Sequence, residues 1–281
     1  MAQLNDILVM AHRGFRGIAP ENTLAAARKG FEAGAAWWEL DVAASSDGEL
    51  VVIHDDKLSR TTDAEARFPS RDPWTVYDFS LAELKSLDAG SWYAVKDPFG
   101  QVASGRVGAA ELASFEGERL PTLRECLELT KRSRRKVNVE IKDATGRACD
   151  PWLVERTVEL IREMGMVGDT LISSFNHEYL RRVKKAEPRL EVGALVEDRP
   201  PELVPLLREL KARSYHPGAK SLDEATVREV RAAGFDVFVW TPNELPLMER
   251  LLDWGSTGLI TDFPDLALEL LARRSRGHGA R

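Results

Sequence analysis

Two histidines and two closely spaced carboxylates lie in one short segment near the start of this chain. Between Ala11 and Asp55 the sequence contains Ala11-His12-Arg13-Gly14, Glu39-Leu40-Asp41 and His54-Asp55. Each group stands at or next to the end of an apolar run, and strand ends are where barrel and open-sheet enzymes place their reactive residues. A histidine near its unperturbed pKa can take or give a proton at neutral pH. The segment therefore indicates acid–base chemistry by His12 and His54.

Strand parity brings a third carboxylate to the first two. In a strand at 38–42, Glu39 and Asp41 share one face, and in a strand at 136–142 Glu140 shares a face with Lys142, opposite the apolar side chains. The apolar faces suit helix packing, so the polar faces point inward, where an unpaired charge is costly. Three inward carboxylates are hard oxygen ligands that suit one divalent cation, Mg²⁺ or Ca²⁺. For Glu39 alone, a structural ion pair with Lys142 is an equal alternative.

Arg13 adds a group that suits a phosphate. Its planar guanidinium matches phosphate oxygens in a bidentate way. Two histidines on either side of a phosphorus centre can act as base and acid, while a metal ion and an arginine neutralise the equatorial oxygens. The sequence has no Cys/His set with zinc spacing. The residues together give the hypothesis of a metal-dependent phosphodiester hydrolase.

The elements that must position these residues alternate between short apolar runs and helical periodicity. Strands are predicted at 7–11, 38–42, 136–141, 170–174, 191–196, 214–216, 236–241 and 258–261. Helices are predicted from an N-cap at Asn22 to near Gly34, and at 152–164, 177–186, 202–210, 222–233, 244–253 and 266–272. Eight strands in this alternation favour a closed (β/α)8 TIM-type barrel over an open doubly wound sheet. No dinucleotide-binding or Walker motif follows the first strand.

One tight turn and one irregular stretch interrupt the pattern. Ser46-Asp47-Gly48 predicts a turn that can only return the chain antiparallel, so 50–54 is a hairpin arm that ends at His54. Residues 56–120 form an insertion with partial structure between this hairpin and the third barrel strand. Residues 1–55 and 121–272 then make one barrel domain, and the basic residues 273–281 a disordered tail. Capping boxes at Ser80/Glu83 and Thr122/Glu125 predict two further helix starts.

Composition sets the remaining bounds. The chain has 281 residues, a hydrophobic fraction of 43% and a formal charge of −6, which argues against non-specific binding to nucleic acid. Cys126 and Cys149 cannot support a disulfide scaffold, so reduced thiols and a cytoplasmic location are expected. The N-terminus lacks a secretory pattern, and no run approaches the roughly 20 apolar residues of a membrane helix. We therefore expect no stable membrane insertion.

The motifs, in their order, resemble the glycerophosphodiester phosphodiesterase family, particularly its bacterial cytosolic members. The match runs from about Ala11 to Pro264. It is carried by His12-Arg13-Gly14, Pro20-Glu21-Asn22-Thr23, Glu39-Leu40-Asp41-Val42, Asp47-Gly48, His54-Asp55, Arg60-Thr61-Thr62, Leu87-Asp88-Ala89-Gly90, Pro121-Thr122-Leu123, Glu140-Ile141-Lys142, Ser173-Ser174-Phe175, Val239-Trp240-Thr241 and Ile260-Thr261-Asp262. The resemblance implies a TIM-type barrel with a small insertion after the hairpin. Two positions depart from the family pattern, Trp37 and Pro242, and neither belongs to the expected catalytic set.

The resemblance also implies a role for each site residue. His12 and His54 would be the general acid/base pair, Glu39, Asp41 and Glu140 the metal ligands, and Arg13 and Lys142 the phosphate contacts. Phe175 and Trp240 would lie near the glycerol end of the substrate, with core packing an equal alternative. The implied reaction converts a glycerophosphodiester to sn-glycerol 3-phosphate and an alcohol. Attack by water and attack by the neighbouring glycerol hydroxyl both remain open.

Two rival functions use the same residues. A lysophospholipase D-type activity on lipids would need an apolar entrance, which Trp74, Trp92, Tyr93 and Phe99 of the insertion could supply. A catalytically silent binding protein on the same fold is the other, because a fold never proves activity. The sequence leaves the headgroup, the native metal and the oligomeric state open.

Overall fold

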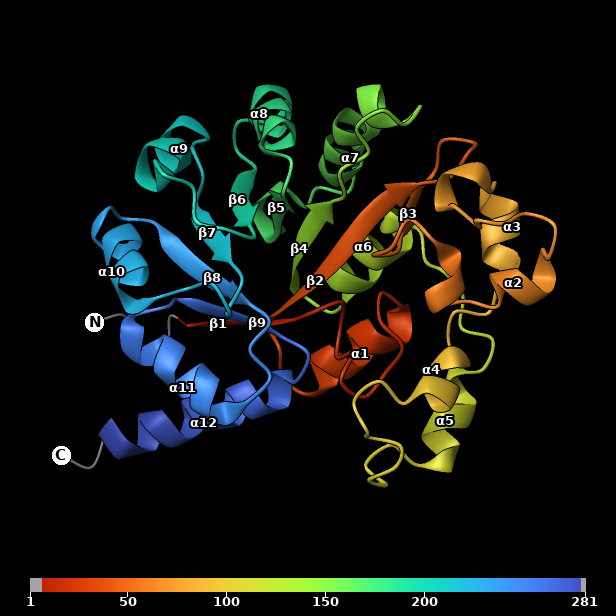
Figure 1. The fold of residues 1–281 in the computed structure, drawn as a ribbon, viewed down its shortest axis with the longest axis horizontal. Coiled ribbons are helices and arrows are strands. Elements are labelled where there is room, and N and C mark those ends of the chain that lie inside the picture. Colours follow the sequence, from red (N-terminus) through yellow and green to blue (C-terminus); the bar gives the residue numbers. More distant parts are fainter. Residues whose placement is uncertain (1–6, 279–281) are drawn as a thin grey trace.

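Eight parallel strands form a closed barrel in this computed structural model, which describes residues 7–278 (Figure 1). They are β1 (Leu8–Ala11), β2 (Trp37–Ala44), β4 (Lys136–Ile141), β5 (Thr170–Ser174), β6 (Glu191–Val196), β7 (Ser214–Pro217), β8 (Asp236–Trp240) and β9 (Gly258–Thr261). Each pairs with its neighbours in chain order, and β1 pairs with both β2 and β9, which closes the ring. The predicted (β/α)8 barrel is confirmed, and every predicted barrel strand is present.

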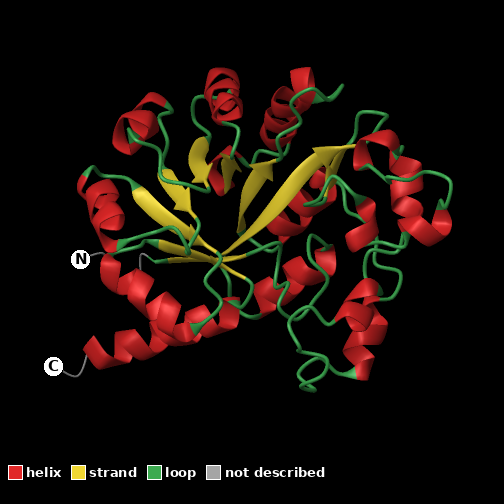
Figure 2. Cartoon of the chain, in the orientation of Figure 1, coloured by secondary structure: helices red, strands yellow, loops and turns green. Residues whose placement is uncertain are grey.

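Helices follow most of the strands and surround the barrel (Figure 2). They are α1 (Leu24–Glu32), α6 (Leu123–Arg132), α7 (Asp150–Glu163), α8 (His177–Ala186), α9 (Leu203–Glu209), α10 (Glu224–Ala232), α11 (Leu245–Trp254) and α12 (Pro264–His278). The capping box at the start of α6 is confirmed, because Thr122 accepts a hydrogen bond from the backbone N–H of Glu125 and the Glu125 carboxylate accepts from that of Thr122. Within residues 7–278, no helix has the length and apolar character needed to cross a membrane.

Two helix ends differ from the sequence prediction. The N-cap of α1 is Thr23 and not Asn22, since the Thr23 hydroxyl accepts from the N–H of Ala26 while Asn22 adopts a positive φ and turns its side chain to Asp41. At the other end of the chain, α12 continues to His278, so residues 273–278 are helical and not a disordered tail. Arg274 contacts Asp253 of α11 at 2.7 Å, which ties this last turn to the barrel. Residues 279–281 lie outside the described part.

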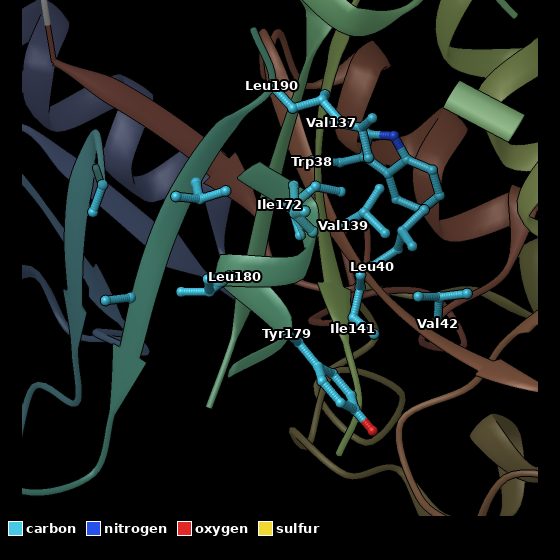
Figure 3. Close-up of a cluster of buried hydrophobic side chains, with 14 of the residues drawn as sticks. Trp38, Leu40, Val42, Val137, Val139, Ile141, Ile172, Tyr179, Leu180 and Leu190 are labelled. Carbon is cyan, nitrogen blue, oxygen red and sulfur yellow. The ribbon is translucent and has the colours of Figure 1, made fainter. Parts of the chain in front are cut away.

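The outward faces of the strands form the main core with the surrounding helices. Figure 3 shows the cluster between β2, β4, β5 and α8; it includes Trp38, Leu40, Val42, Val137, Val139, Ile141, Ile172, Tyr179, Leu180 and Leu190. The Trp38 indole donates to the hydroxyl of Thr130 in α6 at 2.9 Å, so its one polar group is satisfied. The parity prediction is confirmed: Leu40 and Val42 of β2 and Val137, Val139 and Ile141 of β4 face the helices, and Glu39, Asp41 and Glu140 face inward.

An apolar layer lies inside the barrel below the site. Met10, Trp37, Leu171, Phe238 and Ile260 form this inner layer. Trp37 precedes Glu39 and Asp41 on the inward face of β2, so the layer lies on the N-terminal side of the carboxylates. The three carboxylates therefore lie at the C-terminal mouth, where parallel barrels carry their reactive groups.

The hairpin and the insertion lie at one side of the barrel (Figure 1). β3 (Leu50–Val52) pairs antiparallel with the end of β2, as the Asp-Gly turn predicts. The insertion holds α2 (Ala64–Arg67), α3 (Leu81–Ser86), α4 (Trp92–Lys96) and α5 (Ala109–Phe115), with short 3₁₀ turns at Leu58–Arg60 and Val76–Asp78. One of its cores packs on β3, and the other packs on α1 and the loop before it. The predicted capping box at Ser80 is confirmed at the start of α3.

Candidate active site

Three carboxylates converge at the mouth of the barrel. Glu39, Asp41 and Glu140 each place an oxygen within 4.8 Å of the other two, and all three are buried or nearly so. Their strands explain this, because β2 and β4 are neighbours whose register pairs Asp41 with Glu140. The Asp41 Oδ1 atom is buried and has no hydrogen-bond partner among the described residues, its nearest cation being the Lys142 ammonium at 3.5 Å. An acceptor in that position is costly unless a cation satisfies it.

Mutual repulsion and burial perturb all three carboxylates. Burial raises the pKa of Glu39 well above its usual value, and the charges of Asp41 and Glu140 raise it further. Burial and Asp41 also raise the pKa of Glu140. For Asp41, burial acts in the same direction, but Lys142 and Arg13 outweigh it and lower its pKa. The cluster carries more negative charge than its own surroundings neutralise, so these three oxygen ligands fit one hard divalent cation.

Two cations contact this cluster. The Lys142 ammonium lies 2.8 Å from Glu140 and 3.5 Å from Asp41. The Arg13 Nε atom lies 3.3 Å from Asp41, and its Nη1 atom donates to Glu21 at 2.9 Å. Arg13 adopts a φ of 53°, and its backbone N–H donates to Glu39 at 2.9 Å. Both predicted phosphate contacts therefore lie beside the predicted metal ligands, and Lys142 pairs with Glu140 and Asp41, where the structural alternative expected it on Glu39.

His12 lies beside the cluster on a fixed partner. Its Nδ1 atom donates to Asp262 at 2.6 Å, an assignment that follows because an ionised carboxylate can only accept. Its Nε2 atom lies 3.9 Å from Glu39 and faces the site. Asp262 follows β9 and is fixed by Asn243, whose amide donates to it at 2.7 Å. Burial lowers the pKa of His12, and Arg13 lowers it further against the opposing effect of Asp262.

His54 repeats this arrangement on a different element. It follows the hairpin strand β3, as predicted, and its Nδ1 atom donates to Asp55 at 2.5 Å. About a third of its side chain is exposed, against 12% for His12. The charge of His54 lowers the pKa of both Asp41 and Glu140, so its ring lies within electrostatic reach of the cluster. The structure thus brings both histidines to the carboxylates.

Phe175 and Trp240 meet at the mouth of the barrel. They follow or end β5 and β8, and their rings pack edge to face with centroids 5.8 Å apart. Phe175 is 39% exposed, which argues against a core role. The Trp240 indole donates to the backbone carbonyl of His216 at 3.0 Å, so its orientation is fixed. The pair offers an exposed aromatic edge next to the charged site.

Sequence reasoning assigned no role to several polar residues that support the site. Asn22 donates to Asp41 at 2.8 Å and accepts from the backbone N–H of Asp41 at 3.3 Å. Asp262 orients His12, and Asp55 orients His54. The signal was present, because Pro20-Glu21-Asn22-Thr23 and Thr261-Asp262 place polar residues directly after β1 and β9. Their partners lie on other strands, which the sequence alone does not bring together.

Comparison with known proteins identifies the family. The sequence matches the glycerophosphoryl diester phosphodiesterase family over residues 12–266. The chain belongs to this family. A glycerophosphodiester phosphodiesterase of Caldanaerobacter subterraneus subsp. tengcongensis is 36% identical over 266 residues, which cover 95% of this chain and 98% of that relative. One of Bacillus subtilis is 32% identical and covers 92% of this chain and 85% of its own length.

Solved structures agree with the family. An Oleispira antarctica phosphodiesterase in complex with the product sn-glycerol-3-phosphate superposes with a TM-score of 0.77 at 31% identity, covering 94% of this chain and 96% of that one. A putative glycerophosphoryl diester phosphodiesterase of Silicibacter pomeroyi gives a TM-score of 0.80 at 25% identity. The family resemblance seen in the sequence motifs is therefore confirmed. The family is one of hydrolases.

Proposed function

We propose that the chain hydrolyses glycerophosphodiesters to sn-glycerol 3-phosphate and an alcohol with the help of one divalent cation, Mg²⁺ or Ca²⁺. The observation that carries the proposal is the convergence of Glu39, Asp41 and Glu140 beside two histidines that each have a carboxylate on Nδ1. The product bound by the Oleispira relative supports the choice of substrate. A cytoplasmic location remains an expectation from the sequence.

The mechanism follows from the geometry of the side chains. Arg13 and Lys142 lie where they can contact the phosphate oxygens, and Glu39, Asp41 and Glu140 would hold the cation, which when bound stabilises charge on the phosphate. Asp262 and Asp55 each keep the Nδ1 proton of their histidine in place, which leaves both Nε2 atoms free for proton transfer. One ring removes a proton from the attacking oxygen, and the other protonates the leaving alkoxide. Phe175 and Trp240 would contact the apolar edge of the glycerol.

Activity and metal removal together test this proposal. We expect turnover of sn-glycero-3-phosphocholine with Mg²⁺ or Ca²⁺, complete loss after thorough chelation with EDTA, and recovery when either ion is returned. A panel of headgroups would then define the leaving alcohol. Full activity after chelation would refute the metal site, and no turnover on any glycerophosphodiester would refute the substrate class.

A carboxylate variant tests the metal ligands without relying on turnover. Glu39→Gln should remain folded, because the amide relieves the repulsion in the cluster, but it should lose the thermal stabilisation that a bound divalent cation provides. Glu49→Gln is the matched control, since Glu49 is exposed on the hairpin and lies outside the cluster. Equal metal-induced stabilisation of both variants would contradict the assignment.

The four aromatic residues of the lipid-directed alternative each have a partner within the fold. Tyr93 is fully buried and its hydroxyl donates to the backbone of Gly17, while the Trp92 indole donates to Ala89 and the Trp74 indole to Phe68. Phe99 packs edge to face on Phe263. These contacts favour a structural role for the four side chains, in the insertion and in its contact with the barrel.

A further inference from the structure

One arginine of the insertion bonds two carboxylates at once. The Nε and Nη2 atoms of Arg60 donate to the two oxygens of Asp55, the latter at 3.1 Å, and Nη1 and Nη2 donate to the two oxygens of Glu21 at 2.9 and 2.7 Å. Because the guanidinium donates to a carboxylate from each of two edges, it has little freedom of orientation. Asp55 is also the partner of His54 Nδ1. The contacts therefore run without a break from His54 through Asp55 and Arg60 to Glu21.

Glu21 fixes the far end of this linkage to the barrel side of the site. Its side chain is only 2% exposed, and it also contacts Arg13 at 2.9 Å and Arg16 at 3.0 Å. Burial opposes ionisation of Glu21, but the arginines outweigh it and lower its pKa well below the usual value. Arg16 reaches within 3.7 Å of Asp262, the partner of His12. Glu21 thus connects the supports of both histidines.

His54 needs such an anchor more than His12 does. β3 has three residues and ends before His54; one edge pairs with the end of β2, and on the other edge Val52 donates to the backbone carbonyl of Pro121 at 2.9 Å. Among the described residues, the His54 ring hydrogen-bonds only to Asp55, and the other side-chain partner of Asp55 is Arg60. The carbonyl of Arg60 accepts from Lys96 at 2.7 Å, which joins helix α4 to the same point. Nothing else in these contacts sets the direction of the ring.

We propose that Arg60, anchored by Glu21, is a positioning residue that fixes His54 in line with the phosphate and His12. The inference rests on the acid–base role proposed above for His54. Arg60 would act on His54 through Asp55, to which it donates. A displacement of about 1 Å of a catalytic group can cost about 10²-fold in rate, so loss of the linkage should affect kcat far more than KM.

Substitution of Arg60 tests the proposal. Arg60→Met keeps most of the aliphatic stem, and we expect kcat to fall by about 10–100-fold with KM within about 3-fold of wild type. Arg60→Lys restores the charge but cannot bond both carboxylates by two edges, so it should recover only part of the loss. Arg147→Met is the matched control, because Arg147 pairs at 3.1 Å with Asp56, the neighbour of Asp55, and makes no contact with His54. Its kcat should stay within about 2-fold of wild type.

Combination with His54→Ala separates positioning from a merely structural role. If Arg60 acts through His54, Arg60→Met should cause no further loss of kcat in a His54→Ala background, because groups that act as a unit are not additive. An equal further loss in that background, or a kcat near wild type for Arg60→Met alone, would overturn the proposal. Loss of the fold in both Arg60 variants would make the linkage structural and would overturn it as well.

A readout without turnover distinguishes failure of this proposal from failure of the proposed reaction. The Nδ1 proton of His54, bonded to Asp55, should give a low-field proton NMR resonance in the wild-type protein, assigned by its absence in His54→Ala. Arg60→Met should weaken or shift this resonance and Arg147→Met should not. An unchanged resonance in Arg60→Met refutes the positioning role even if the wild-type protein turns over no glycerophosphodiester.

Discussion

The two histidines of the site use the same local arrangement on very different supports. Each donates from Nδ1 to an aspartate, at 2.6 Å for His12 and 2.5 Å for His54. His12 directly follows β1, and its Asp262 directly follows β9, so two adjacent strands of the closed barrel fix both partners. His54 and Asp55 are neighbours in the chain on a hairpin outside the parallel ring.

The two histidines show that an aspartate partner can be positioned either by strand pairing or by side-chain hydrogen bonds. On the His12 side, Asp262 accepts from Asn243, and its backbone N–H donates to Asn243 at 3.0 Å. On the His54 side, the aspartate partner Asp55 is anchored through its side chain by Arg60, which also bonds Glu21. Adjacent barrel strands therefore position the partner of one histidine, and a charged side chain of the insertion positions the partner of the other.

Removal of either histidine is the largest expected effect. His12→Ala and His54→Ala should each lower kcat by about 10²–10⁴-fold, because each removes a proton-transfer group. An aryl leaving group needs no protonation, so a 4-nitrophenyl ester of glycerol 3-phosphate should largely rescue the variant that lacks the general acid and leave the other impaired. Steady-state kinetics on alkyl and aryl substrates would measure this. Near wild-type turnover in either variant would remove that histidine from the mechanism.

The sequence predicted which strands carry the site residues better than it predicted the side-chain contacts that support them. Period-2 alternation in β2 and β4 was enough to predict that Glu39, Asp41 and Glu140 all point into the barrel, because each strand has only two faces, one inward and one outward. The Asp-Gly turn predicted the hairpin that carries His54. The contacts of Asp262 and Arg60 were not predictable in this way, since they join residues as far as 250 positions apart or lie in an irregular insertion.

Substitution of two glycines tests how strongly the backbone is constrained near His12 and in the hairpin that leads to His54. Gly14 follows Arg13 at a φ of 79°, and a Cβ there would lie 2.5 Å from the backbone of Ala26. Gly48 forms the hairpin turn at a φ of 88°, where the nearest atom to a Cβ is 3.9 Å away. Gly14→Ala should lower the free energy of unfolding by about 2–4 kcal/mol, and Gly48→Ala by about 1–2 kcal/mol from its backbone conformation alone.

Urea unfolding and kcat of both glycine variants would check this expectation. Gly14→Ala should also lower kcat, because the backbone N–H of Arg13 that contacts Glu39 must shift with the loop. Gly48→Ala should leave kcat close to wild type, since the turn lies at the far end of the hairpin from His54. Equal losses of stability and kcat in the two variants would show that the loop after β1 and the hairpin turn are equally constrained, which would contradict this expectation.

A third histidine, His216, shows what the aspartate partners contribute. It lies on β7 inside the same barrel, but its Nε2 atom contacts the hydroxyl of Ser214 at 2.8 Å, and its buried Nδ1 atom has no hydrogen-bond partner among the described residues. Burial lowers the pKa of His216 to about 3, and Arg213 adds to the effect. Unlike the two site histidines, its ring is fully buried and hydrogen-bonds to no carboxylate in residues 7–278.

His216 should therefore affect the stability of the fold and have the smallest effect on catalysis. Its pKa is about 3 in the folded state and near 6.5 in the unfolded state, so between these values the unfolded chain binds the extra proton and stability falls as the pH falls. From pH 7 to pH 5 the group should cost about 2 kcal/mol. In His216→Gln this part of the loss should disappear, as urea unfolding at both pH values would show, because the carboxylates titrate alike in both proteins. An equal pH dependence in both proteins would mean that the ring is protonated inside the barrel, and that burial without an aspartate does not distinguish it from the histidines of the site.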